Sequence, residues 1–126
     1  MGYTHYWYQT RSLTPPEWQD FLTAARPLVA GHNCYIGDAY EWARSAGPHL
    51  VLETDCETLE ISQQRPPDRS GTRRLDPSEP EGYFRFCKTN RSPRYDPIVV
   101  GVLKALQAAA PDAITLRSDG GAAVFA

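Results

Sequence analysis

The sequence has few of the residues that would place it in several common protein classes. It contains three cysteines, Cys34, Cys56 and Cys87, and no CxxC pair. Neither a disulfide framework nor a four-cysteine zinc site is therefore expected. No apolar run approaches the roughly 20 residues of a bilayer-spanning helix. The first residues also lack the basic and apolar regions of a signal peptide. These features predict a cytoplasmic protein without a membrane partner.

Cofactor and metal motifs are also missing. The sequence contains neither GxGxxG nor a GKS or GKT tripeptide, so a dinucleotide-binding fold or a P-loop ATPase is not supported and no cofactor is expected. His32 and Cys34 are one residue apart, and Asp55, Cys56 and Glu57 are consecutive. Neither group has a zinc or calcium spacing, so no metal site is predicted.

The charge is nearly balanced overall but is unevenly distributed. The 126 residues carry a formal charge of −2, which does not favour nucleic acid as a partner. Residues 1–63 hold three basic and eight acidic residues, a balance of −5, whereas residues 64–126 hold ten basic and seven acidic residues, a balance of +3. Four of the basic residues fall within ten positions without a carboxylate: Arg85, Lys88, Arg91 and Arg94.

The hydrophobic pattern predicts a single α+β domain over residues 1–126. Strands are expected at 2–9, 50–53, 58–62, 82–89, 113–117 and 122–125, the last two as a terminal hairpin. One helix begins at a capping box of Thr14 and Glu17 with Pro15 in its first turn, and Pro27 kinks it or ends it early. A second helix follows Asp96, taken as its N-cap, and Pro97.

The order of these elements favours an antiparallel or mixed sheet with both helices on one face, for which a ferredoxin-like topology is the first hypothesis. Residues 63–81 are rich in proline and arginine and poor in apolar residues. This composition predicts an exposed loop, more often a solvated linker than a lid or a partner-binding segment.

Three stretches together resemble a known family: Met1–Trp7 (MGYTHYW), Phe86–Thr89 (FCKT) with Tyr95-Asp96 downstream, and Ser118–Gly120 (SDG). The family comprises small uncharacterised proteins of bacteria and their phages. Its middle stretch reads FCKT, a short basic linker and Pro-Tyr-Asp, from which this chain departs by placing Arg94 between Pro93 and Tyr95. The resemblance implies a shared fold and a bacterial or phage source, but no particular activity.

Three residues within these stretches are candidates for catalysis: His5, Cys87 and Asp119. If the first strand lies beside strand 82–89, His5 approaches Cys87, as in a base and nucleophile pair. The alternative is structural. A cysteine on an alternating strand is most often buried, a histidine among aromatics is usually a packing residue, and Asp-Gly-Gly usually makes a turn.

The basic stretch predicts a binding site for an anion. The candidate ligand-binding residues are Lys88, Thr89, Arg91, Arg94 and Tyr95. They precede a helix start, where free amides and the helix dipole favour negative charge, and a neighbouring tyrosine can stack on a planar group. Asp96 opposes this interpretation, because a capping carboxylate occupies the same amides.

Three functions remain open from the sequence. The first is a bacterial or phage accessory protein that binds a small anionic ligand, such as a nucleotide or another phosphorylated molecule. The second is a small hydrolase or transferase that uses His5 with Cys87 or Asp119. The third is a protein-interaction module without catalysis, which docks through the aromatic first strand or through the loop at 63–81.

Overall fold

The computed structural model describes residues 2–39, 43, 45–67 and 80–126. Within these residues the elements follow the order β1 (Thr4–Gln9), α1 (Pro15–Val29), β2 (Cys34–Asp38), β3 (Pro48–Leu52), β4 (Leu59–Ser62), β5 (Tyr83–Lys88), α2 (Asp96–Ala109), β6 (Ile114–Ser118) and the short 3₁₀ helix η1 (Ala122–Phe125). All strand pairs are antiparallel. The α+β class is therefore confirmed.

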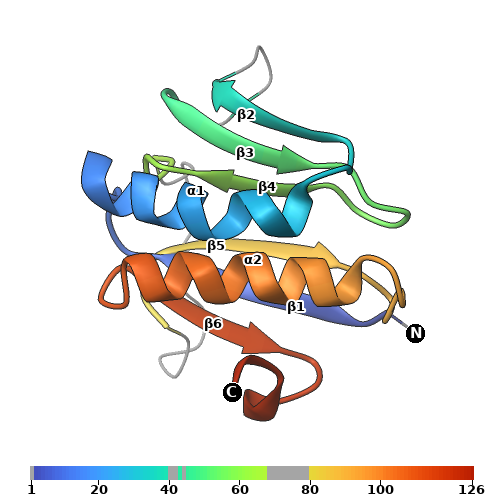
Figure 1. Cartoon of the computed structure of the whole chain (residues 1–126). Helices are drawn as coiled ribbons and strands as arrows, with labels where there is room; N and C mark the ends of the chain where they lie inside the picture. The colour runs from blue at the N-terminus through green and yellow to red at the C-terminus, as the bar shows by residue number, and fades with distance from the viewer. Residues whose placement is uncertain (1, 40–42, 44, 68–79) are drawn as a thin grey trace.

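The strands form two three-stranded sheets, β5-β1-β6 and β2-β3-β4. In Figure 1 the strands succeed one another from β2 at the top to β6 at the bottom, and both helices cover the same face. Strands β4 and β5 are neighbours across the boundary between the sheets, where Arg85 Nη1 donates to the carbonyl of Glu60 at 2.9 Å. The ferredoxin-like topology stays a prediction, because β4 and β5 belong to separate hydrogen-bonded sheets.

The hydrophobic core lies between the helices and both sheets. Helix α1 buries the stripe that its three- and four-residue spacing predicts: Trp18, Phe21, Leu22, Ala25 and Val29. Helix α2 packs against α1 and buries Val99, Val102, Leu103 and Leu106. The β3–β4 hairpin contributes the four core residues expected of it: Leu50, Leu52, Leu59 and Ile61. The two sheets thus share one core, as a single domain of this size requires.

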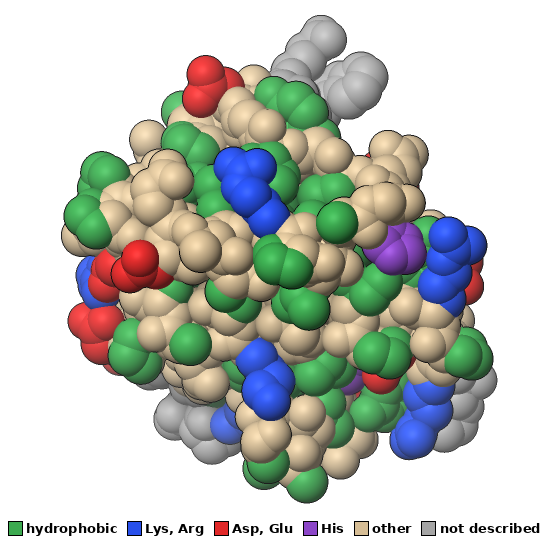
Figure 2. Space-filling model, viewed as in Figure 1, with side chains coloured by type: hydrophobic (Ala, Val, Ile, Leu, Met, Phe, Trp, Pro, Cys, Tyr) green, Lys and Arg blue, Asp and Glu red, His purple; other side chains and the backbone are tan. Residues whose placement is uncertain are grey.

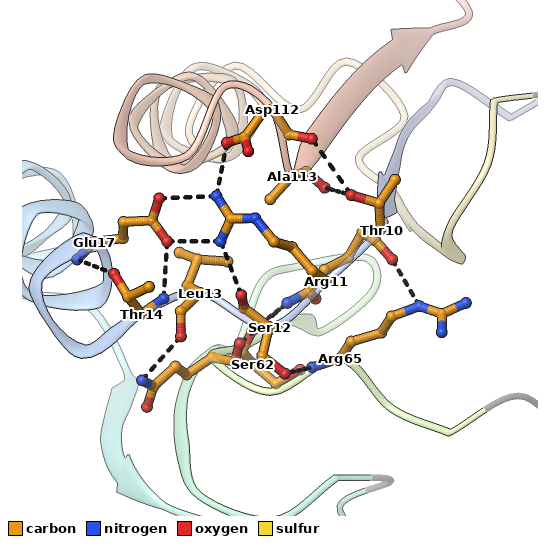
Figure 3. Close-up of polar contacts among 12 residues, drawn as sticks. Thr10, Arg11, Ser12, Leu13, Thr14, Glu17, Ser62, Arg65, Asp112 and Ala113 are labelled. Atoms are coloured by element: carbon orange, nitrogen blue, oxygen red, sulfur yellow. Dashed lines mark hydrogen bonds and ion pairs between the residues drawn. The ribbon is translucent and has the colours of Figure 1, made fainter.

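The start of α1 is fixed by a group of polar contacts (Figure 3). The predicted capping box is present, since the Glu17 amide donates to Thr14 Oγ1 and the Thr14 amide donates to Glu17 Oε1. Arg11 binds both carboxylate oxygens of Glu17, at 2.8 and 3.0 Å, and also contacts Asp112 at 2.7 Å. Because Asp112 follows α2, this arginine joins the beginning of one helix to the end of the other.

The structure corrects several local predictions. Residues 122–125 form η1 instead of a strand, because Gly121 adopts a φ of +86° and turns the chain back, its amide bonding the carbonyl of Ser118. Strand β2 was not expected. Helix α1 continues through Pro27 to Val29, since a proline near the C-terminal end disturbs only the last turn. Residues 68–79 of the predicted loop lie outside the described residues.

The face covered by the helices has no strong charge of one sign in view. Figure 2 shows acidic and basic side chains scattered among hydrophobic and other polar atoms on this face. Neither helix among the described residues has the length and apolar character needed to cross a membrane.

Candidate functional site

The three stretches that carry the family resemblance meet at one end of the β5-β1-β6 sheet. In the ladders His5 lies opposite Cys87 on one side and Ser118 on the other. Beyond the strand ends, the Thr89 amide donates to the Tyr3 carbonyl at 2.9 Å, and the Asp119 amide donates to the Thr4 carbonyl at 3.0 Å. Strand pairing thus confirms the expectation that the first strand and strand 82–89 are neighbours.

His5 is the centre of this end of the sheet. Its side chain is fully buried, and both ring nitrogens have polar partners. Nδ1 lies 2.8 Å from Ser118 Oγ, and Nε2 lies 2.7 Å from Asp96 Oδ1. The first partner comes from the edge strand β6 and the second from the first residue of α2. Serine, histidine and aspartate therefore form one continuous hydrogen-bonded chain.

The outer members of this chain determine its proton positions. A backbone amide only donates, and that of Gly120 bonds Ser118 Oγ at 3.0 Å, so the serine hydroxyl is available to donate to His5 Nδ1. At the other end Thr89 Oγ1 donates to Asp96 Oδ1. Because an ionised carboxylate only accepts, the hydrogen of a neutral His5 ring is assigned to Nε2. With these assignments each hydrogen bond among Ser118, His5, Asp96 and Thr89 has one donor and one acceptor.

Aromatic rings enclose the imidazole of His5. Tyr3 meets it edge-on with centroids 5.2 Å apart, and Phe125 of η1 does so at 5.7 Å. The Arg91 guanidinium lies 4.1 Å from the centroid of the Tyr3 ring, a cation–π distance. The tyrosine also leaves no room beside Gly120, where a Cβ would be 2.1 Å from its hydroxyl oxygen. These rings hold the imidazole in one orientation.

Ser118 also borders a cavity of about 550 Å³ between α2, β6 and η1. The lining includes Gln107, Leu116, Arg117 and Phe125. This volume falls within the range of small-molecule sites, and the mix of apolar walls with a few polar groups is typical of them. The same ring that packs on His5, Phe125, thus forms part of the cavity wall. A space of small-molecule size therefore adjoins Ser118.

The carboxylate of Asp119 has partners other than His5. Its carboxylate accepts the Thr4 amide at 3.0 Å and the Tyr6 hydroxyl at 3.0 Å, and neither bond involves His5. Burial, followed by the hydrogen bond to Asp119, raises the pKa of Tyr6 above its ordinary value. Asp119 therefore fastens the turn after β6 to the start of β1, which is the structural alternative.

Cys87 lies opposite His5 in the ladder but lacks the setting of a nucleophile. It is fully buried, and its thiol contacts the Glu57 carbonyl at 3.6 Å, while both nitrogens of His5 bind other groups. Burial, with a smaller effect of the Glu57 charge, raises the pKa of Cys87 to about 12. Nucleophilic cysteines need the opposite shift. The geometry favours the packing role.

The predicted anion-binding segment uses most of its donors within the protein. Thr89 binds Asp96, Ser92 Oγ donates to Asp55 at 2.9 Å, and the Lys88 amide donates to Glu57 Oε1 at 2.6 Å. The acidic turn between β3 and β4 is thus the partner of two of these donors, the Ser92 hydroxyl and the Lys88 amide. Arg94 lies 5.3 Å from the Tyr95 ring centroid and is exposed. Two exposed guanidinium groups, those of Arg91 and Arg94, remain on the surface.

Asp96 is the residue of this site that sequence reasoning assigned differently. The helix N-cap is Tyr95, without a side-chain cap bond, and Asp96 is the first helical residue. Its carboxylate turns inward because two buried donors, His5 Nε2 and the Thr89 hydroxyl, lie there. Ser118 belonged to a stretch singled out by resemblance but was not proposed as a partner of His5. The two residues are 113 positions apart, and no local spacing reveals such a contact.

No group of three or more histidine, cysteine, aspartate or glutamate side chains within the described part of the chain is placed to hold a metal ion. Comparison of the chain with protein-family models, with curated proteins and with solved structures gives no match. The function is therefore argued from the geometry of this site.

Proposed function

We propose that the protein is a small hydrolase or acyl transferase in which Ser118 is the nucleophile, His5 the general base and Asp96 the group that orients the base. The observation that carries this proposal is the hydrogen-bonded chain from Ser118 Oγ through both nitrogens of His5 to Asp96 Oδ1, at 2.8 and 2.7 Å. These are the distances at which a base takes a proton from a nucleophile. His5 keeps the role of base that the catalytic hypothesis gave it, but its partners are Ser118 and Asp96 instead of Cys87 or Asp119.

The chemistry follows from the proton positions. Ser118 Oγ attacks the carbonyl carbon of an ester bound in the adjoining cavity, and its proton moves to His5 Nδ1. Asp96 stabilises the resulting imidazolium through the Nε2 hydrogen. The proton on Nδ1 then passes to the leaving alcohol as the ester bond breaks, giving an acyl-serine. Water, deprotonated by the same imidazole, releases the acid and restores the hydroxyl.

A serine-directed probe tests this proposal. We expect a fluorophosphonate to add one covalent group at Ser118, detected by intact mass and peptide mapping. Ser118→Ala should abolish the adduct. Ser12→Ala, which removes an exposed hydroxyl before α1, should leave it unchanged. An unlabelled native protein, or equal labelling of Ser118→Ala, would overturn the proposal.

Asp96→Asn tests the role of the carboxylate. The amide oxygen still accepts hydrogen bonds from His5 and Thr89, so the fold is kept, but the imidazolium loses its counter-charge. Turnover of p-nitrophenyl acetate should fall roughly 10²- to 10⁴-fold with an unchanged circular dichroism spectrum. Wild-type turnover by a folded Asp96→Asn would remove aspartate from the mechanism.

A second proposal is noncovalent recognition of a small anionic ligand, a nucleotide or another phosphorylated molecule, by Lys88, Thr89, Arg91, Arg94 and Tyr95. The supporting observation is that Arg91 and Arg94 are each held over a tyrosine ring, at 4.1 and 5.3 Å from its centroid. A thermal-shift screen of nucleotides, cyclic nucleotides and sugar phosphates tests it, because a ligand that binds the native state raises Tm. Arg94→Ala should lose that shift while Arg26→Ala keeps it; equal shifts in both would contradict it.

A further inference from the structure

The face of the β5-β1-β6 sheet opposite the helices carries a row of aromatic side chains. Tyr6 lies opposite Phe86, and Tyr8 lies opposite Phe84. Paired residues share a face and neighbours along a strand alternate, so these rings lie on the side opposite Trp7, Cys87 and the rest of the core. In Figure 1 both helices lie in front of this sheet, and the aromatic row is on its other side.

Two of these rings are unusually exposed. Phe84 has 45% and Phe86 has 53% of its surface accessible, whereas a phenylalanine is ordinarily buried. Tyr6 stacks beside Phe84 with an interplanar angle of 21°, and Phe84 lies 5.8 Å from Phe86. We call Tyr6, Phe84 and Phe86 the aromatic row. A hollow of about 190 Å³ lies beside it, bordered by Phe84, Phe86 and, from β4, Glu60.

The charged residues that strands β5, β1 and β6 place on this face are cations, while the acid Glu60 of β4 borders the hollow beside it. Arg117 lies opposite Tyr6 in β6, and Lys88 follows Phe86 by two positions in β5 and lies opposite Thr4. Arg117 is exposed. The exposed Arg91, in the turn after β5, lies over the ring of Tyr3 and so belongs to the His5 side of the sheet. Asp119 also stands near this end, but its carboxylate is engaged by Thr4 and Tyr6.

We propose that this face binds single-stranded nucleic acid, with bases stacked on the aromatic row and phosphates near Arg117 and Lys88. Stacking does not depend on base identity, because every base has a π-face, and flanking cations attract the backbone. An antiparallel sheet with exposed aromatic rings and helices behind it is a general solution to this problem. The formal charge of −2 belongs to the whole chain, whereas binding depends on the cations that this face presents, Arg117 and Lys88.

Charge complementarity selects this occupant over a protein partner. An apolar protein surface would leave Arg117 and Lys88 without counter-charges, whereas each phosphate supplies one. Duplex nucleic acid is disfavoured, because its bases are stacked on one another and cannot lie on Phe84 and Phe86. The aromatic row is separate from the proposed hydrolase, whose serine lies among residues of the opposite face. Arg117 also borders the cavity beside Ser118, so the Phe86 variants are the ones that test this inference alone.

Fluorescence anisotropy with labelled dT15 and rU15, and with a 15-base-pair duplex, tests the proposal on the whole chain. We expect both single strands to bind more tightly than the duplex at low salt, and a comparison of the two shows whether DNA or RNA is preferred. Phe86→Ala should weaken binding about tenfold, the usual effect of losing one stacked base. Arg117→Ala should also weaken it and reduce the slope of log K against log salt by about one.

The controls separate stacking from general apolar contact. Phe86→Leu keeps an apolar side chain but loses the π-face, so it should weaken binding about as much as Phe86→Ala. Tyr35→Ala removes an exposed ring of similar accessibility, 49%, from β2 and should change nothing. Because these side chains are half exposed, the variants should keep the wild-type melting curve. Equal binding of single strands and duplex, or wild-type binding by Phe86→Leu, would overturn the proposal.

Discussion

Asp96 shows how a buried partner overrides the local role of a residue. Aspartate followed by proline is a typical helix start, and α2 does begin at that point. The carboxylate nevertheless binds His5 and Thr89. A buried imidazole with an unpaired nitrogen costs more free energy than an exposed helix amide that water satisfies. Residue types and element boundaries were therefore predictable here, whereas the contact was not, because His5 lies 91 positions away.

The three cysteines give a test at the residue scale. Cys56 is exposed, Cys34 is partly buried and Cys87 is buried, and burial raises the pKa of Cys87 to about 12. Since the thiolate is the reactive form, iodoacetamide at neutral pH should label Cys56 first in the native protein and Cys87 only after unfolding. Peptide mass mapping over time measures the order. Early labelling of Cys87 would restore it as a nucleophile.

Among the elements, α1 was the easiest to predict because its signals are local. Thr14 and Glu17 are three residues apart, and the capping box they form depends only on that spacing. Strand β2 gave no such signal: its Cys-Tyr-Ile-Gly-Asp sequence combines a glycine with an exposed Tyr35. The residues of η1 have a composition that also suits a strand. What decides their structure is the turn at Gly121, after which Phe125 packs against the core.

The start of α1 should make stability depend on pH. The hydrogen bonds from Arg11, with a smaller effect of the Thr14 amide, lower the pKa of Glu17 from 4.5 to about 2. A lowered native pKa contributes stability above the unfolded value, and that contribution is lost as pH falls from about 4.5 towards 2. Glu17→Gln should flatten the urea midpoint over this window, and the exposed-carboxylate control Asp20→Asn should follow the wild type. A Glu17→Gln curve parallel to the wild type would contradict the assignment.

For the whole molecule, the boundary between the two sheets is the feature that could not be predicted from any one segment of the sequence. Their edge strands β4 and β5 are joined by side chains, with the buried Arg85 bonding the Glu60 carbonyl and lying 3.7 Å from its carboxylate. Most of the strands, the β3–β4 hairpin and the core stripes were predictable from periodicity, whereas β2 and the end of the chain were not. How two sheets meet depends on which polar groups of each edge strand are not paired within its own sheet. These groups can be identified only when the structures of both sheets are known.

Arg85 gives the test at this scale. Arg85→Ala leaves the Glu60 carbonyl without its donor and opens space at the boundary, so unfolding free energy should fall by about 2–3 kcal/mol. Arg26→Ala, an exposed position in the last turn of α1, should cost less than about 0.5 kcal/mol. Urea denaturation of both variants provides the comparison. Equal losses would mean that Arg85 does not join the sheets.

The central position of β1 has a consequence for how the protein forms. Its partners are distant in the chain, since Thr4 pairs with Lys88 and His5 pairs with Ser118. A ribosome therefore synthesises β1 long before β5 and β6, and until they are made the tyrosines and the tryptophan of β1 remain exposed to solvent. Such contact order slows folding to the millisecond-to-second range and leaves time for self-association. Refolding yield should accordingly decline as protein concentration rises, because nascent β1 strands meet one another before β6 arrives.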